Sequence, residues 1–323
     1  MTDPATYSRG SRREPRCRLM FESESSCPLI LRWLALTLLV LVSGCERTGE
    51  AEHGVSSERA GLEARGQWLT GGGDESQAYY SPLADINRDN VGQLGYAWHH
   101  DLPAERGYEA TPLMVDGVLY GSGPTGTAFA LDAASGELLW RFEPEIDLGF
   151  VRKVCCGVVN RGVAIQGDRL YVASLDGYLY ALDLHSGAIR WRADTFVDRE
   201  RGYTITGAPY LAGNVVVIGN AGAEFDAQGY ITAYDAVTGE HRWRFFTVPA
   251  SAPGPHEHPE LALAASTWDP NSLWKVGLGG TVWDAMVYDA ELGLLYVGTG
   301  NAAPYPRKLR SPGGGDNLYL ASI

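Results

Sequence analysis

An eleven-residue motif recurs three times in this sequence and constrains its fold more than any other feature. The copies run from Ala130 to Trp140, from Ala181 to Trp191 and from Ala233 to Trp243. All three share the pattern Ala/x/Asp/x/x/Ser or Thr/Gly/x/x/x/Trp and follow one another at about fifty residues. The pattern predicts a strand that ends at the aspartate, a tight turn in which Ser or Thr supplies hydrogen bonds and glycine takes a positive φ, and a return strand that ends on the tryptophan.

Each copy of the motif is preceded by another short apolar segment, at residues 117–120, 167–172 and 213–218. About four strands in each period of about fifty residues are typical of β-propeller blades, because one blade cannot bury both of its faces without neighbours. Weaker copies end at Trp98 and run from Thr281 to Gly298. We therefore expect an all-β propeller in which each tryptophan packs between adjacent blades and residues 250–275 form an inserted surface loop. A two-sheet sandwich is the alternative, although a sandwich would not need the repeated motif.

The composition supports many short strands and excludes one class of partner. The 323 residues include 40 glycines, 17 tyrosines and nine tryptophans, and 20% of them are charged. The formal net charge of −13 would repel a nucleic acid, which needs a basic groove. The acidity serves either solubility or docking of a basic partner, and both interpretations remain open.

The N-terminus resembles an export signal. Residues 28–42 form an apolar run that is short for a membrane span, and Val42-Ser43-Gly44-Cys45 follows as a lipobox. We expect residues 1–45 to be a signal peptide, with Met20 as an alternative start, and residues 46–65 to be a flexible tether. The protein would then be periplasmic and membrane-anchored through lipidated Cys45. An ordinary signal peptide and an uncleaved anchor are the alternatives.

Two adjacent cysteines, Cys155 and Cys156, are the only ones in the predicted folded part, residues 66–323. In an oxidising compartment they have no other partner, so a disulfide between them is one interpretation. Neighbouring Cα atoms are about 3.8 Å apart, below the usual disulfide range, so the ring would be strained, and such strain often serves function. A reduced buried pair is the alternative.

The familiar catalytic signatures are missing from the sequence: HExxH, GxSxG, a Walker loop, a Rossmann GxGxxG and CxxCH. His256 and His258 stand in a proline-rich loop, where histidines are more often solvated than bound to metal. Glu224 and Asn301 offer the hard oxygen donors that Ca²⁺ prefers, although a structural or solvated role is the alternative for each. A propeller would gather several polar residues at one mouth of its channel: Glu109, Arg161, Thr206, Glu224 and Asn301.

Six segments resemble, in order, the cofactor-site motifs of the alcohol dehydrogenases that depend on pyrroloquinoline quinone (PQQ). The resemblance begins near Gln67 and continues to the last residue, and vicinal cysteines followed by Asn-Arg-Gly are specific to that group. The closing segment 307–323, together with Trp283-Asp284, is more similar to the quinohemoprotein branch than to the methanol dehydrogenases. The six segments are Tyr108–Pro112, Cys155–Gly162, Thr204–Pro209, Gly222–Glu224, Gly280–Asp284 and Gly298–Asn301.

The resemblance implies a role for each candidate residue. A disulfide between Cys155 and Cys156 would cover one face of the quinone, and Trp283 would stack on the other. Glu224 and Asn301 would ligate Ca²⁺, which acts as a Lewis acid on a quinone carbonyl. The other cofactor contacts would come from Glu109, Arg161, Thr206, Gly222, Ala223 and Thr281.

The same resemblance implies oxidation of a small alcohol by hydride transfer to PQQ, with electrons passed to a periplasmic acceptor, expected to be a c-type cytochrome. The aspartate that takes the alcohol proton is expected beyond Ile323, so no catalytic residue is assigned and the chain alone is expected to be an inactive, C-terminally incomplete part of an eight-bladed propeller. Two alternatives are a non-catalytic propeller lipoprotein that acts as an outer-membrane assembly or binding scaffold, and a decayed quinoprotein kept as a binding module. A scaffold would have no reason to keep the Cys-Cys segment.

Overall fold

The computed structural model describes residues 66–74, 76–102, 107–154, 157–284 and 286–323, all within the compact unit Ser57–Ile323. The predicted signal peptide and lipobox, the tether, and the Cys155-Cys156 pair lie outside these described residues. In the described part of the chain, no helix combines the length and the apolar character that a bilayer crossing requires.

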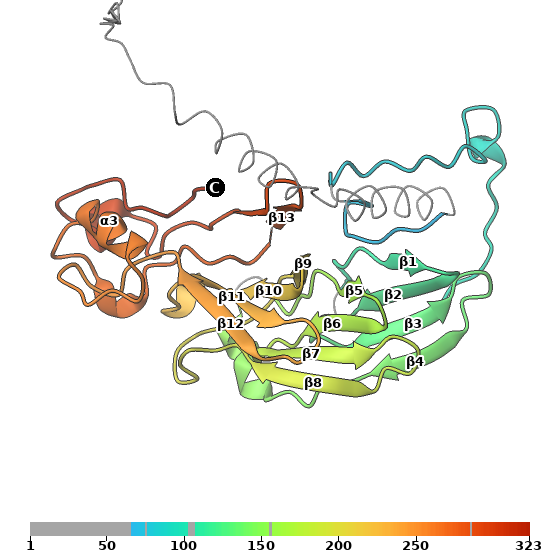
Figure 1. The fold of residues 1–323 in the computed structure, drawn as a ribbon, viewed down its shortest axis with the longest axis horizontal. Coiled ribbons are helices and arrows are strands. Elements are labelled where there is room, and N and C mark those ends of the chain that lie inside the picture. Colours follow the sequence, from blue (N-terminus) through green and yellow to red (C-terminus); the bar gives the residue numbers. More distant parts are fainter. Residues whose placement is uncertain (1–65, 75, 103–106, 155–156, 285) are drawn as a thin grey trace, which may run out of the picture. The chain divides into compact units, whose positions relative to one another are not determined.

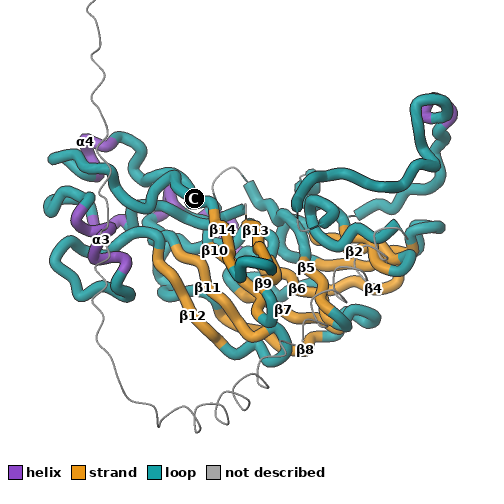
Figure 2. Tube along the Cα trace, turned by 45° about the horizontal axis from the view of Figure 1, so that its top comes forward, coloured by secondary structure: helices purple, strands orange, loops and turns teal. Residues whose placement is uncertain are grey.

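Three four-stranded antiparallel sheets follow one another along the chain, as the repeat predicted (Figures 1 and 2). The first is β1 (Leu113–Val115), β2 (Val118–Ser122), β3 (Ala128–Asp132) and β4 (Leu138–Phe142). The second is β5 (Ala164–Gln166), β6 (Arg169–Ala173), β7 (Tyr178–Asp183) and β8 (Ile189–Asp194). The third is β9 (Tyr210–Ala212), β10 (Val215–Gly219), β11 (Tyr230–Asp235) and β12 (His241–Phe246). A two-stranded sheet of β13 (Met286–Asp289) and β14 (Leu294–Val297) comes last.

The helical elements are short and lie in the connections. The α-helices are α3 (Glu260–Ser266) and α4 (Arg307–Arg310). The 3₁₀ turns are η1 (Val91–Gln93), η2 (Leu148–Lys153), η3 (Ala223–Phe225) and η4 (Trp274–Val276).

The aspartate of each repeat holds the turn that the motif predicted. In the second copy the Asp183 carboxylate accepts hydrogen bonds from the backbone N–H and the hydroxyl of Ser186, at 2.9 and 2.7 Å. These bonds and the neighbouring Arg190 hold the pKa of Asp183 well below its ordinary value. Asp132 and Asp235 make the same turn contacts. The expectation that the return strand ends on the tryptophan is wrong, because β4 continues past Trp140 to Phe142.

The motif tryptophans dock on the following repeat. The indole Nε1 of Trp98 donates to the carbonyl of Ala133 at 3.1 Å. Trp140 repeats this contact on Leu184 at 3.0 Å, and Trp191 repeats it on the Ala236 carbonyl at 3.2 Å. The prediction that the tryptophans pack between blades is therefore confirmed for these three.

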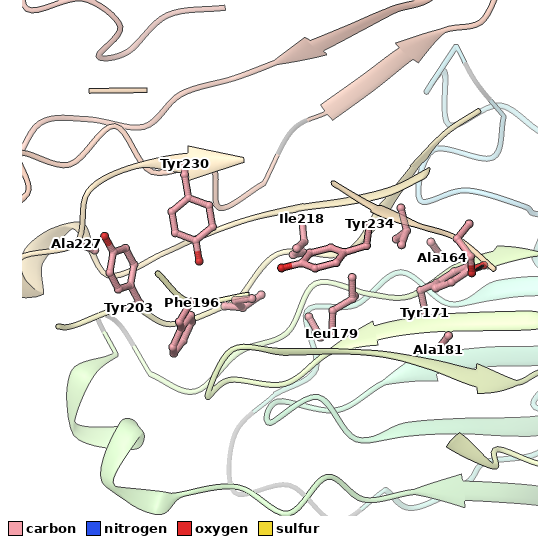
Figure 3. Packing of buried hydrophobic residues seen from close by; sticks show 14 of the residues in the cluster. Ala164, Tyr171, Leu179, Ala181, Phe196, Tyr203, Ile218, Ala227, Tyr230 and Tyr234 are labelled. Carbon is pink, nitrogen blue, oxygen red and sulfur yellow. Dashed lines mark hydrogen bonds between the residues drawn. The ribbon is translucent and has the colours of Figure 1, made fainter. Parts of the chain in front are cut away.

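The hydrophobic core lies between consecutive sheets rather than inside any one of them. Tyr171 and Ile218 belong to one buried cluster that joins the second sheet to the third (Figure 3). A second cluster joins the first sheet to the second, and a third joins the third sheet to β13 and β14. Each of the four-stranded sheets thus needs its neighbour for burial, which is the behaviour of propeller blades.

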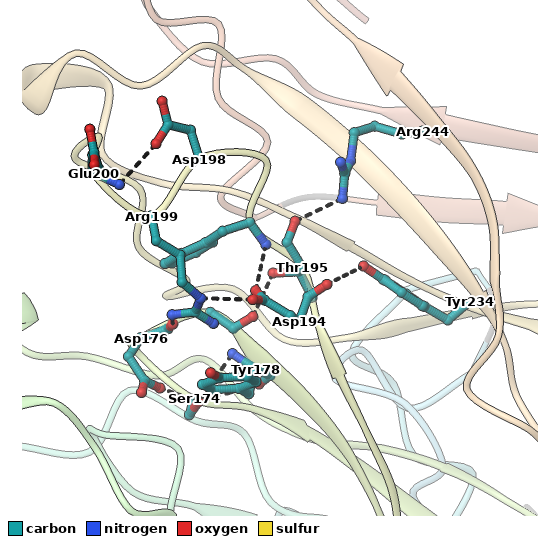
Figure 4. Close-up of polar contacts among 12 residues, drawn as sticks. Ser174, Asp176, Tyr178, Asp194, Thr195, Asp198, Arg199, Glu200, Tyr234 and Arg244 are labelled. Atoms are coloured by element: carbon teal, nitrogen blue, oxygen red, sulfur yellow. Dashed lines mark hydrogen bonds and ion pairs between the residues drawn. The ribbon is translucent and has the colours of Figure 1, made fainter.

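Polar bonds at the outer edge of the second sheet reinforce this stacking (Figure 4). The Tyr234 hydroxyl donates to the Asp194 carbonyl at 3.1 Å, and Arg244 Nη2 donates to the Thr195 carbonyl at 2.9 Å. Arg199 pairs with the Asp194 carboxylate at 2.7 Å. The bonds of Tyr234 and Arg244 connect the end of β8 to the third sheet, whereas the Arg199 pair lies within the second repeat.

The insertion at residues 250–275 is more ordered than the surface loop that we expected. Helix α3 buries Leu261, and Trp268 packs in a small cluster with Val248 and Leu278. The expectation that the histidines are solvated is wrong for His258. Its Nε2 accepts a hydrogen bond from the Phe246 N–H at 3.0 Å, and its ring stacks on Phe245 at 4.1 Å.

Candidate functional site

Arg161 brings together three of the residues that the sequence predicted. Its guanidinium carbon lies 4.8 Å from the ring centroid of Trp283, and its Nη2 lies 3.2 Å from Glu109 Oε2. The backbone N–H and Nη1 of Arg161 both donate to the carbonyl of Thr206, at 3.1 and 3.2 Å. A carboxylate, a guanidinium and an indole therefore form one cluster.

The blade repeat explains why residues so far apart in the sequence meet here. Glu109, Arg161, Thr206 and Trp283 each lie three or four residues before the first strand of successive sheets, β1, β5, β9 and β13. Corresponding positions of stacked repeats lie on the same side of the stack. The cluster is thus a consequence of the repeat.

Asn160 fixes the segment that carries Arg161, and the sequence analysis did not single it out. The side chain is 2% exposed and lies between two sheets. Its Oδ1 accepts from the Ser122 hydroxyl at 2.5 Å and from the Gly162 N–H at 3.1 Å, while its Nδ2 donates to the Ala173 carbonyl at 2.9 Å. A buried amide with all of these bonds restrains the backbone next to Arg161. Its only sequence signal was its place in Asn-Arg-Gly.

Two glycines, which the sequence analysis also missed, crowd Trp283. A Cβ on Gly207 would lie 2.6 Å from the Trp283 carbonyl oxygen, and a Cβ on Gly300 would lie 3.1 Å from its indole Nε1. A larger residue at position 300 would displace the indole, and one at position 207 would press on the Trp283 backbone. Trp283 is nevertheless 42% exposed, which is high for so large an aromatic side chain held on two sides. The exposed part of this side chain could contact a flat group.

The two predicted threonines lie beside this cluster and are buried. Thr206 contributes its carbonyl to Arg161, and Thr281 contributes its carbonyl to the Gly300 N–H at 2.9 Å. Their contacts within the chain are thus made by the backbone.

The loop that carries Glu224 has a rigid start. Gly222 has a φ of +97°, and a Cβ there would lie 2.0 Å from the Gly202 carbonyl oxygen, so only glycine fits. Ala223 is buried, whereas Glu224, in the first turn of η3, is exposed. The carboxylate of Glu224 therefore belongs to an exposed residue that directly follows a fixed glycine turn.

Asn301 lies in the corresponding loop of the next sheet. Glu224 follows β10 and Asn301 follows β14, the second strands of their sheets. Isolated bridges from Gln228 to Gly279 and from Gly279 to Ala302 connect the two loops. Asn301 donates through Nδ2 to the Ala302 carbonyl at 3.1 Å, and its Oδ1 remains an available oxygen donor.

The side chains of Glu224 and Asn301 offer too few ligands to complete a calcium site by themselves. Among the residues that the structure describes, no group of three or more His, Cys, Asp or Glu side chains could hold a metal ion. Calcium takes six to eight oxygen ligands. Glu224 and Asn301 fit such an ion if further oxygen ligands, from the chain, a bound cofactor or water, complete its coordination.

The family follows from a match over most of the chain. Residues 68–323 match the family model described as the β-propeller domain of glucose, ethanol and alcohol dehydrogenases that use PQQ. The chain belongs to the PQQ-dependent alcohol dehydrogenase family. This confirms the resemblance and the β-propeller fold.

Named members of the PQQ-dependent alcohol dehydrogenase family are similar over the same region. Quinohemoprotein alcohol dehydrogenase ADH IIB of Pseudomonas putida is 49% identical over 295 residues, which are 91% of this chain and 41% of that protein. The structure of quinohemoprotein alcohol dehydrogenase ADHIIG from Pseudomonas putida HK5 matches with a TM-score of 0.79 and 46% identity, over 82% of this chain and 39% of that one. A europium-containing methanol dehydrogenase matches with a TM-score of 0.71 and 32% identity, over 81% and 47%. The chain thus spans about two fifths of the length of its quinohemoprotein relatives.

Proposed function

We propose that this chain binds PQQ against the indole of Trp283 and is part of an enzyme that oxidises small alcohols. The observation that carries the proposal is the Arg161 guanidinium 4.8 Å from the Trp283 ring centroid, with Glu109 beside it. The guanidinium is itself flat and delocalised, so the indole face accepts a flat group. PQQ is flat and carries carboxylates, and it supplies the hydride acceptor when bound.

The chain's own residues would bind and orient this cofactor. Arg161 presents planar N–H donors that match a carboxylate. Glu109 orients the guanidinium from the side, and Asn160 and Thr206 restrain its backbone. Further contacts would come from Thr281, Gly222 and Ala223. The disulfide between Cys155 and Cys156, over the opposite face of the cofactor, remains part of the proposal.

Equilibrium dialysis with PQQ tests the site. We expect Trp283→Ala and Arg161→Lys each to weaken PQQ binding on the order of tenfold, through loss of stacking and of the planar fork. Trp243→Ala and Arg192→Lys are matched controls, because Trp243 is 39% exposed and Arg192 lies over Tyr178 at 4.6 Å, outside the cluster. Equal losses in the controls and in the site variants would contradict the proposal.

We also propose that Glu224 and Asn301 ligate Ca²⁺ beside the cofactor, where it would act as a Lewis acid. PQQ affinity should then rise with Ca²⁺, and Glu224→Gln should remove most of that dependence while Glu137→Gln, an exposed turn carboxylate, keeps it. The similarity to a europium-containing enzyme makes La³⁺ the informative second metal. Support of PQQ binding by La³⁺ but not by Ca²⁺ would reject the calcium assignment.

The setting of the enzyme is part of the same proposal. A small alcohol is the substrate, a c-type cytochrome accepts the electrons, and the protein is periplasmic with a lipid on Cys45. Cys45→Ser should release the protein from the membrane fraction and remove the lipid mass from its N-terminus. Retention of both in the variant would reject the anchor.

A further inference from the structure

A pocket of about 230 Å³ shares none of its lining residues with the proposed PQQ site. At about 30 Å³ for each water in the liquid, this space holds roughly seven waters, so it suits a molecule of only a few heavy atoms. The lining residues are Arg201, Gln228, Pro249, Ala250, Trp274, Lys275 and Gly277.

The charge of the lining favours an anion. It contains two cationic side chains, Arg201 and Lys275, and no carboxylate, in a chain of net charge −13. Lys275 is exposed and has no acidic partner within 4.0 Å among the described residues. Arg201 Nη2 donates to the Asp226 carbonyl, and the Asp226 carboxylate accepts from the neighbouring Gly202 N–H at 3.0 Å. Glu257 is linked to the lining through Gln228 Nε2 at 3.4 Å but does not itself line the pocket.

The remaining lining residues are uncharged, and Trp274, Gln228 and Gly277 are held in place. Trp274 donates its indole N–H to the Pro270 carbonyl at 3.0 Å, and its ring lies 5.6 Å from that of Trp268. Gln228 is buried and donates to the Val248 carbonyl at 2.8 Å. At Gly277, where φ is +73°, a Cβ would lie 2.4 Å from the Asp226 carbonyl oxygen, so the backbones pack directly. The pocket is therefore built from restrained side chains.

We infer that this pocket binds a small aliphatic monocarboxylate. The carboxylate would interact with Arg201 and Lys275, and a short apolar tail would lie against Trp274 and Pro249. Two cations beside an indole match an anion with an apolar end better than a fully hydrated inorganic anion. The site is additional to the proposed function and does not depend on it.

Butyrate provides the test. In the full chain labelled with ¹⁵N at its nine tryptophans, the indole signal of Trp274 is assigned by its loss in Trp274→Phe. Butyrate should shift that signal saturably, and Lys275→Gln should raise the dissociation constant on the order of fivefold to tenfold. Lys308→Gln removes an exposed lysine from α4 and should leave butyrate binding unchanged.

Two further ligands separate the contribution of the carboxylate charge to binding from the contribution of the apolar tail. 1-Butanol has a similar tail without the charge and should give no saturable shift, and inorganic phosphate should bind more weakly than butyrate. The inference is overturned if butyrate produces no saturable shift, if Lys308→Gln weakens it as much as Lys275→Gln, or if 1-butanol or phosphate binds as tightly. No PQQ is present, so failure here is distinguishable from failure of the proposed function.

Discussion

The turn glycines and the motif tryptophans act together at the level of single residues. A Cβ on Gly187 would lie 2.6 Å from the Trp140 ring, and Gly136 and Gly239 have the same relation to Trp98 and Trp191. Each glycine therefore satisfies two requirements at once, a positive φ in its own turn and room for the indole of the preceding repeat.

A comparison of Gly187→Ala with Gly167→Ala should separate the cost of displacing the indole from the cost of backbone strain alone. Gly187 has a φ of +70°, whereas Gly167 has a φ of +58° and a Cβ there would meet no atom within 4 Å. We expect Gly167→Ala to lower the free energy of unfolding by about 1 kcal/mol and Gly187→Ala to lower it by about 3 kcal/mol, because the latter also displaces Trp140. Urea unfolding measures the free energy of unfolding of both variants. Equal losses would show that the indole contact contributes nothing.

The sequence motifs identified the candidate site residues but not the residues that hold those side chains in place. Arg161, Glu109 and Trp283 were predicted from their segments, and the structure brings them into one cluster. Asn160 and Gly207 were missed because their contacts run to other blades, to Ser122 and to the Trp283 backbone. Such contacts depend on how the sheets stack, which one segment of sequence does not encode.

At the level of elements, the outer strand β12 is covered by the insertion. The Phe246 N–H donates to His258 Nε2, which also lies 3.0 Å from the Phe246 carbonyl oxygen, and Nδ1 of the same ring lies 3.0 Å from a carboxylate oxygen of Glu260. The ring also stacks on Phe245. The sequence suggested a solvated loop here because His-Glu-His-Pro-Glu is polar and contains a proline. The residues that contact His258, however, belong to β12, which precedes the insertion.

His258→Ala should therefore cost stability although the residue is polar and belongs to an insertion. Loss of its hydrogen bond and stacking contact predicts a decrease of about 1–2 kcal/mol in the free energy of unfolding. His185→Ala, at an exposed position of a turn, should change it by less than about 0.5 kcal/mol. Equal free energies of unfolding for the two variants would show that His258 does not attach the insertion to β12.

At the level of the whole molecule, the stacking of sheets was predictable because the repeat recurs with constant residues. The bounds of the three four-stranded sheets follow the motif copies closely. The insertion interrupts the repeat of about fifty residues. The small core beside helix α3 arises from contacts between residues 248–278 and 318–320, and no repeated sequence pattern marks these contacts.

The tyrosines buried between the second and third sheets predict a loss of stability at alkaline pH. Burial raises the pKa of Tyr171 to about 12, and burial also raises the pKa of Tyr203. A phenol with a raised pKa in the folded state is favoured there in its neutral form. The contribution of the neutral phenol to the stability of the folded state is complete below the ordinary pKa of about 10. This contribution is lost as the pH rises from there to about 12.

Urea midpoints between about pH 9 and pH 11.5 should therefore fall, and Tyr171→Phe should reduce the steepness of that fall. The substitution leaves the Ala236 carbonyl with a donor, Trp191 Nε1, so its cost at neutral pH should be about 1 kcal/mol. Tyr305→Phe, at a position 66% exposed, should leave the pH dependence unchanged. An identical fall in all three proteins would contradict the assignment to Tyr171.

A crystal structure of this chain grown with PQQ and Ca²⁺ tests most directly whether a flat cofactor lies on the indole of Trp283. We predict density for PQQ in van der Waals contact with the Trp283 ring, with Arg161 at a PQQ carboxylate and a metal ion between Glu224 and Asn301. PQQ bound away from Trp283, or a metal ion that contacts neither Glu224 nor Asn301, would contradict the central claim.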